Sequence, residues 1–299
     1  MTEPMHADEV DTDADLVRRL LRAQHPQWAD LPIERLASDG TDHAIYRLGE
    51  ELAARLPRIH WAAGQVASER RWLPVLAPLL PLRLPVPVAS GAPGAGYPFE
   101  WCVSPWIEGE RLTAATVADP LEAVDTLVGF IRALQAVEPS GGPVPRGRGG
   151  PLAERDEAVR KSIAAMGTSV DPAAVTAAWD ADRRAPVWEG PGVWIHGDLS
   201  TGNVLAHEGR VRAVIDWGTA CVGDPACELH AAWNLFSGEH RMAFRSALAV
   251  DDATWARARA WALSVALLYI PYYEHTYPPG VALARQTVAR VLADHEGAG

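Results

Sequence analysis

The stretch of chain from Trp194 to Gly218 carries polar side chains suited to chemistry on a phosphate group. It reads WIHGDLSTGNVLAHEGRVRAVIDWG and holds Asp198, Asn203 and Asp216. Phosphoryl transfer needs a carboxylate that accepts or orients the proton of the attacking hydroxyl. It also needs hard oxygen ligands for the Mg²⁺ that bridges the nucleotide phosphates. Asp198 suits the first role, as catalytic base, and Asn203 and Asp216 suit the second, as metal ligands.

Short strands are expected to hold these three residues. The runs VWI, NVLAH and VRAVI have the composition of strands, and HEGR between the last two is typical of a hairpin turn. A hairpin brings its two outer ends together. We therefore expect Asn203 and Asp216 at one end of a small sheet, with Asp198 on the loop that precedes it.

The segment HGDLSTGN resembles the catalytic loop of the aminoglycoside phosphotransferase and choline kinase-like family of small-molecule kinases. It is also similar to the HRDxxxxN loop of protein kinases, and DWG at 216–218 resembles their DFG. Further segments follow in the order that this family shows: GTDHAIYRLG, RLPR, WLPVLAP, VGDPACEL and PYYEHTYP. The resemblance covers almost the whole chain. It implies a two-lobed protein-kinase-like fold, ATP or GTP as co-substrate with Mg²⁺, and transfer of the γ-phosphoryl group to an alcohol group.

The resemblance also implies a cation on the third strand that holds the nucleotide phosphates, paired with a glutamate from the next helix. Arg55 in AARLP and Glu69 in VASERRWLP occupy these places. Arginine stands where the family usually has lysine, and its planar fork differs in geometry from a point charge. A surface salt bridge with no part in binding is the alternative reading of this pair.

Two further segments are implied nucleotide contacts. SDGTDH at 38–43 takes the place of the kinase glycine-rich loop without its G-x-G-x-x-G pattern, and Gly40 and Thr41 there can offer backbone amides to phosphates. Its alternative is an ordinary hairpin turn. Ser104 to Trp106 takes the place of the hinge and is expected to face the nucleotide base, although Pro105 lacks an N–H donor. For the side chain of Trp106, packing in the core is an equal alternative.

The acceptor is expected over the C-terminal part of the chain, near YYEHT. Tyr273, Glu274 and His275 combine an aromatic face with polar tips, which suits an amphipathic ring system. Burial of a tyrosine in the core is one alternative. A rigid turn made by Pro278 and Pro279 is the other.

Glu228 and His196 are candidates for roles around the catalytic loop. Glu228 lies in GDPACEL, where the family usually has aspartate. It is counted among the acceptor contacts and is also placed to brace the loop. His196 has the residue type of a general base, but its place in the motif favours a structural role in ordering the loop.

The pattern of elements predicts an α+β fold with a small β-rich lobe and a larger, mainly helical lobe. A helix is expected at about 13–24, three strands within 33–57, and a second helix over 62–79 before the strand FEWCVS. The pattern changes at SPWIEGE. We therefore predict a nucleotide-binding lobe at 1–104 and a catalytic and substrate-binding lobe at 105–299, in which Asp119 starts a strong helix and 156–180 has helical character.

Charge and cysteine content limit the partners. A net charge of -11 without a dense basic run argues against nucleic acid. The three cysteines lack CxxC spacing, so neither a zinc site nor a disulfide framework is expected. The acidic start is unlike a signal peptide, and the most apolar stretch, 261–273, is shorter than the roughly 20 residues that span a bilayer. We expect a cytoplasmic protein without a membrane partner.

Two classes of function are compatible with these residues. The first is a kinase for a hydroxylated antibiotic or small metabolite, and the second is a nucleotide-binding regulatory module without turnover. The presence of Asp198, Asn203 and Asp216 together favours the kinase. A protein kinase is disfavoured, because the chain after DWG contains no activation loop that ends in APE.

Overall fold

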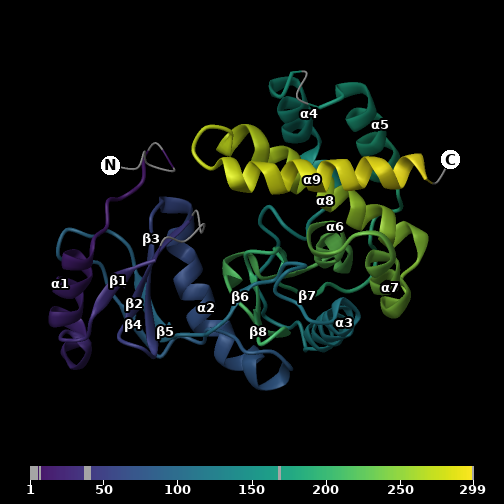
Figure 1. The fold of residues 1–299 in the computed structure, drawn as a ribbon. Coiled ribbons are helices and arrows are strands. Elements are labelled where there is room, and N and C mark those ends of the chain that lie inside the picture. The colour runs from purple at the N-terminus through teal and green to yellow at the C-terminus, as the bar shows by residue number, and fades with distance from the viewer. Residues whose placement is uncertain (1–5, 7, 37–41, 168–169, 298–299) are drawn as a thin grey trace.

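The first part of the chain forms a five-stranded antiparallel sheet in the order β1-β2-β3-β5-β4. The computed structural model describes residue 6 and residues 8–36, 42–167 and 170–297. In it, the sheet lies beside a larger, mainly helical region (Figure 1). The α+β class is therefore confirmed. The strands of the sheet are β1 (Ile33–Arg35), β2 (His43–Leu48), β3 (Leu52–Pro57), β4 (Ala89–Gly91) and β5 (Trp101–Pro105).

The two faces of this sheet have different neighbours. Ala54 and Leu56 belong to one buried cluster with the apolar face of helix α1 (Ala14–Gln24). Successive side chains of a strand point to opposite faces, so Arg55 and its cross-strand partner Ile45 lie on the other face. One face of the sheet thus packs against α1, and the other face directs Arg55 toward the rest of the protein.

Helix α1 forms where its apolar periodicity predicts. Its buried residues share one face, and the carboxylate of Asp13 accepts a hydrogen bond of 2.6 Å from the backbone N–H of Leu16. A 3₁₀ helix, η1 (Pro26–Trp28), follows it. The expected helix at 13–24 is confirmed to within one residue.

Helix α2 (Ala63–Leu76) lies between the sheet and the helical region (Figure 1). The 3₁₀ helices η2 (His60–Ala62) and η3 (Ala77–Leu79) extend it at both ends, as the expected helix over 62–79 requires. Its buried Leu73 and Leu76 belong to the large core cluster of the helical region. Helix α2 is therefore packed into the core of the helical region.

The helical region begins with α3 (Pro120–Gln135), whose first residue is Pro120 and whose cap is Asp119. The Asp119 carboxylate accepts hydrogen bonds from the backbone N–H groups of Leu121 and Glu122, which lack helical partners. The later helices are α4 (Asp156–Ala165), α5 (Pro172–Arg183), α6 (Ala231–Leu235), α7 (Gly238–Leu248), α8 (Asp252–Tyr273) and α9 (Pro278–Glu296), with the 3₁₀ helices η4 (Leu152–Arg155), η5 (Trp217–Thr219) and η6 (Pro225–His230).

The expectation of one helical stretch over 156–180 is corrected, because α4 and α5 are separate helices. Gly167 has a left-handed φ of 54° just after α4, a conformation that ends helices. Asp171 then caps α5 and Pro172 starts it. Local helix-ending and helix-starting residues therefore cause the break, and apolar periodicity alone does not detect them.

Two small sheets carry the strands around the catalytic motif. In one, β6 (Glu110–Arg111) and β9 (Arg210–Val214) flank β8 (Val204–His207). The β8–β9 hairpin turns at Glu208 and Gly209, whose φ angles of 51° and 76° match the favoured two-residue turn.

The strand VWI belongs to the second small sheet instead of lying next to the hairpin. It is β7 (Val193–Ile195), and it pairs with β10 (Cys221–Gly223), a strand that the sequence did not predict. Ile195 stands opposite Cys221 in this ladder. The catalytic motif therefore crosses from one sheet to the other.

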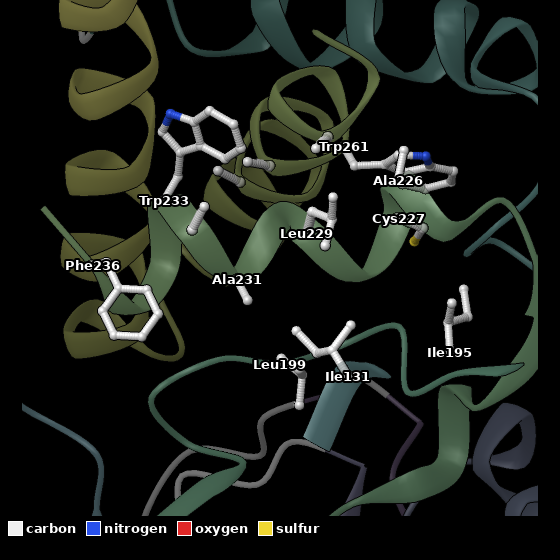
Figure 2. Close-up of a cluster of buried hydrophobic side chains, with 14 of the residues drawn as sticks. Ile131, Ile195, Leu199, Ala226, Cys227, Leu229, Ala231, Trp233, Phe236 and Trp261 are labelled. Carbon is white, nitrogen blue, oxygen red and sulfur yellow. The ribbon is translucent and has the colours of Figure 1, made fainter. Parts of the chain in front are cut away.

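The core of the helical region reaches the catalytic motif directly. Figure 2 shows Leu199 next to Ile131 of α3, beneath the segment of η6 that carries Cys227 and Leu229. Leu199 directly follows Asp198 and is completely buried, so it anchors this loop to the core. In the part of the chain that the structure describes, none of the helices has the length and apolarity to cross a membrane.

Candidate active site

Asp198 lies on the loop between β7 and β8, and Asn203 holds its side chain. The amide nitrogen of Asn203 donates to Asp198 Oδ2 at 2.8 Å and to the main-chain carbonyl of Asp198 at 2.9 Å. The other carboxylate oxygen, Oδ1, lies 3.8 Å from Nη2 of Arg148. About a third of the Asp198 side chain remains exposed. The carboxylate is thus oriented by neighbours and still accessible, as a catalytic base must be.

His196 orders this loop from inside the core. Its ring is completely buried, and Nδ1 accepts a hydrogen bond of 3.2 Å from the backbone N–H of Asp198. Nε2 must therefore carry the hydrogen and donate to the carbonyl of Ile215 at 3.0 Å. Burial lowers the pKa of His196. Because both ring nitrogens are occupied and the neutral form is favoured, the geometry fits the structural role.

Glu228 braces the same loop. Its Oε2 accepts a hydrogen bond of 2.9 Å from the backbone N–H of Gly197. The side chain is completely buried, and this burial raises the pKa of Glu228 to about 7, partly opposed by backbone hydrogen bonds. The expected acceptor contact at Glu228 is corrected, because a carboxylate with no accessible surface supports the loop and does not face a ligand.

Asn203 and Asp216 are brought together by a backbone hydrogen bond. The N–H of Ile215 donates to the carbonyl of Asn203 at 2.9 Å, so Asp216 directly follows the residue that pairs with Asn203. Asp216 has a left-handed φ of 61°, which a non-glycine residue adopts at an energetic cost and which turns its side chain out of the strand direction. The hairpin expectation for this pair agrees with these contacts.

These two residues fit a metal that takes its other ligands from elsewhere. Among the described residues there is no group of three or more His, Cys, Asp or Glu side chains placed to hold a metal ion. Mg²⁺ prefers a few protein oxygens together with phosphate oxygens and water. The Asn203 amide donates its nitrogen to Asp198, which leaves its side-chain oxygen as a ligand beside the carboxylate of Asp216.

Arg55 and Glu69 form a buried ion pair. The Arg55 Nη1 to Glu69 Oε2 distance is 2.6 Å, and the two side chains are 9% and 0% exposed, which excludes the surface salt bridge. Arg55 Nη2 also lies 3.1 Å from Oδ1 of Asp216. The second oxygen of Glu69 accepts a hydrogen bond of 3.1 Å from the backbone N–H of Trp217. This network joins β3 and α2 to the DWG segment.

The remaining nucleotide candidates lie in the segment before β2 and at the end of β5. Gly40 and Thr41 lie outside the described residues. Ser104 is buried and stands opposite Ala53, two residues before Arg55 and on the same face of the sheet. It is therefore on the surface that would cover a nucleotide held by Arg55.

The side chain of Trp106 lies outside the core. Its ring stacks on the guanidinium of Arg47, with 4.8 Å from Cζ to the ring centroid, and its Nε1 donates to Glu108. Its backbone N–H donates to the carbonyl of Glu51 at 2.7 Å, so that donor is occupied. The core-packing alternative is excluded, and any base contact in this segment has to use other groups.

The YYEHT segment lies at the end of α8. Tyr273 is largely buried, with its ring centroid 4.4 Å from that of Tyr269. Glu274 pairs with Arg285 at 3.2 Å, and His275 is exposed. Burial raises the pKa of Tyr269, and the neighbouring Tyr277 and the charge of Asp198 add to the rise.

Residues 33–261 match the model of the phosphotransferase enzyme family. The chain belongs to the phosphotransferase enzyme family. The expected family resemblance is thereby confirmed, together with the prediction of an enzyme that transfers a phosphoryl group to an alcohol group. A comparison of this phosphotransferase with curated proteins gave no match.

Solved structures with the same fold include aminoglycoside and macrolide phosphotransferases. The GDP and kanamycin complex of APH(2")-IIia has a TM-score of 0.74 and 18% identity, covering 93% of this chain and 98% of the other. The macrolide 2'-phosphotransferase MphH from Brachybacterium faecium has a TM-score of 0.59 and 25% identity, covering 94% and 98%. The streptomycin–ATP–APH(2")-IIa ternary complex has a TM-score of 0.59 and 16% identity, covering 87% and 91%.

Proposed function

We propose that this phosphotransferase transfers the γ-phosphoryl group of ATP or GTP to a hydroxyl of an antibiotic or small metabolite, with Asp198 as catalytic base. The observation that carries the proposal is the pair of hydrogen bonds from Asn203 that orient the Asp198 carboxylate while leaving it accessible. Asp216, which is linked to Arg55, supplies a second carboxylate at the same place. This combination matches the needs of phosphoryl transfer.

The chain's own residues have separate tasks in this mechanism. Asp198 accepts the proton of the acceptor hydroxyl as its oxygen attacks the γ-phosphorus. Arg55 holds nucleotide phosphates through its planar fork, and Glu69 keeps it in place. Asn203 and Asp216 would hold Mg²⁺, which neutralises phosphate charge when bound. His196 and Glu228 hold the backbone of the catalytic loop.

The related structures indicate which nucleotides and which acceptors to consider. The related structures contain GDP in one case and ATP in another, so both nucleotides are candidates. One related structure contains kanamycin, another contains streptomycin, and MphH is a macrolide 2'-phosphotransferase. These related structures support an antibiotic acceptor here, and Tyr273, Glu274 and His275 remain candidate acceptor contacts.

We propose the same organisation that the sequence predicts. Residues 1–104 form the nucleotide-binding lobe, and residues 105–299 form the catalytic and substrate-binding lobe. Cys102, Cys221 and Cys227 are free and buried, which supports a reducing cytoplasm. Neither nucleic acid nor a membrane is a partner in this proposal.

The test is turnover by the purified protein with Mg²⁺ and ATP or GTP on a panel of aminoglycosides, macrolides and amino alcohols. Release of nucleoside diphosphate should accompany a gain of one phosphoryl group in the acceptor, as seen by mass spectrometry. Asp198→Asn is the matched control, since it keeps the shape of the side chain. Tight nucleotide binding with no phosphorylated product across the panel would favour the regulatory module instead.

A further inference from the structure

The loop Gly147–Arg148–Gly149 is held against β7, the strand that leads to Asp198. Gly147 and Gly149 both have φ angles of 74°, the left-handed region that glycine tolerates. The carbonyl of Gly147 accepts a hydrogen bond of 2.6 Å from Arg155, and the carbonyl of Gly149 accepts one of 2.9 Å from the backbone N–H of Asp224. The backbone is therefore fixed by hydrogen bonds on both sides of Arg148.

The anchors of this loop are themselves buried. Arg155 is 9% exposed, donates through Nε to Ser264 at 2.9 Å, and lies over the ring of Trp261 at 5.0 Å. A Cβ on Gly149 would lie 2.7 Å from Cδ1 of Ile195 in β7, and the left-handed φ of 74° also favours glycine there. The loop packs directly on the strand that leads to the catalytic motif.

From this loop the side chain of Arg148 reaches the base. Its Nε donates to the carbonyl of Gly197 at 3.0 Å, which fixes the guanidinium beside the catalytic loop. Its Nη2 lies 3.8 Å from Oδ1 of Asp198, longer than a direct hydrogen bond. The side chain is 20% exposed, so part of it remains accessible from solvent.

The two oxygens of Asp198 are thus distinct. Oδ2 is taken by the amide of Asn203, whereas Oδ1 faces Arg148. A hydroxyl that gives its proton to Oδ1 binds beside the guanidinium. In-line attack then places the γ-phosphorus roughly 3 Å from that hydroxyl oxygen, which brings its equatorial oxygens within reach of Arg148.

We propose that Arg148 is a catalytic residue that binds the transferring phosphoryl group. This inference rests on the proposed function. The hydroxyl oxygen forms a bond to the γ-phosphorus, the bond from phosphorus to the bridging oxygen breaks, and its electron pair leaves with the nucleoside diphosphate. The hydroxyl proton goes to Oδ1 of Asp198. Arg148 donates hydrogen bonds to the equatorial oxygens of the phosphoryl group while it is between the two partners.

The test compares binding of Mg·ADP with binding of Mg·ADP plus aluminium fluoride, a mimic of the transferring phosphoryl group. It is run on the full chain by calorimetry, and with GDP if GDP binds more tightly. Fluoride should tighten nucleotide binding by the wild type. Arg148→Met should bind Mg·ADP normally and lose about tenfold to a hundredfold of the tightening, as expected for hydrogen bonds to a charged group. Arg148→Lys should show part of the wild-type tightening. Arg146→Met, which removes an exposed charge on the same loop, is the control and should keep all of it.

Several results would overturn this role. One is full tightening in Arg148→Met, and another is no tightening in a wild type that binds Mg·ADP. An equal loss of Mg·ADP affinity with and without fluoride would show that Arg148 only holds the loop, and would also overturn the proposal. A wild type that binds neither ADP nor GDP removes the proposed function itself, and this inference with it.

Discussion

The amide of Asn203 donates to Asp198 twice, to its carboxylate at 2.8 Å and to its main-chain carbonyl at 2.9 Å. One side chain therefore sets both the orientation of the base and the shape of its loop. The same side chain has an oxygen left for a metal ion. In the proposed mechanism Asn203 therefore couples the base to the metal site, which makes this residue informative to change.

Asn203→Asp is expected to separate these two tasks. The aspartate keeps an oxygen for Mg²⁺ but cannot donate to the Asp198 carboxylate, and it places two negative charges together. The Mg²⁺ concentration needed for half-maximal nucleotide binding should stay near the wild-type value, while kcat falls by about a hundredfold. Asn203→Ala should weaken both. A rise in that Mg²⁺ concentration together with the fall in kcat in Asn203→Asp would contradict separable roles.

Asp198→Asn should abolish proton acceptance without disturbing nucleotide binding. We expect the single-turnover rate to fall by about a hundredfold or more, because a positioned base is lost, with an unchanged Kd for nucleotide. Asp125→Asn, an exposed change on α3, is the control for a general charge effect. Near-normal turnover in Asp198→Asn under conditions where chemistry limits the rate would remove Asp198 from the role of base.

Arg55→Met should destabilise the protein, because it leaves Glu69 buried without its ion partner. Breaking a buried pair from one side costs about 3–5 kcal/mol in the free energy of unfolding. The double variant Arg55→Met/Glu69→Gln should regain much of this loss, since the amide is neutral and still accepts from Trp217. Urea unfolding measures both. Equal stabilities of the single and double variants would argue against a coupled pair.

The buried Glu228 should make stability depend on pH. Its pKa rises from 4.5 in the unfolded chain to about 7 in the folded protein, so between these values the folded state holds more protons than the unfolded state. Stability from this group is therefore complete below pH 4.5 and is lost as the pH rises through 7. The loss amounts to about 3 kcal/mol.

Glu228→Gln removes this ionisation and keeps an oxygen for the backbone N–H of Gly197. The difference in unfolding free energy between variant and wild type should grow in favour of the variant from pH 5 to pH 8. Chemical unfolding at several pH values provides the measurement. Parallel curves for the two proteins would show that Glu228 does not titrate in this range.

Changes at the end of α8 should act on the acceptor alone. Glu274→Ala, His275→Ala and Tyr273→Phe alter polar groups near the expected acceptor position while leaving the aromatic core of α8 in place. At least one of them should raise the acceptor KM several-fold with an unchanged nucleotide KM, because uniform binding is lost. If acceptor KM and kcat stay unchanged in all three, this segment lies outside the site.

Local sequence was sufficient for many of the elements and for choosing Asp198, Asn203 and Asp216 as candidate site residues. Periodicity predicted α1, α2 and α3, because an apolar face is a property of neighbouring residues. The turn HEGR predicted the hairpin that brings Asn203 next to Ile215, since turn geometry depends on only a few residues. The spacing in HGDLSTGN was enough to propose which side chains take part.

Only the tertiary structure decided what surrounds these residues. Burial shows that Arg55 and Glu69 form a core ion pair and not a surface salt bridge. Glu228 is also buried, and it binds the backbone of the catalytic loop instead of facing the acceptor. Arg148 comes from a distant glycine-rich segment whose position depends on Arg155 and the helical core. Contacts between residues far apart in sequence depend on how all the elements pack together, and no local pattern records that packing.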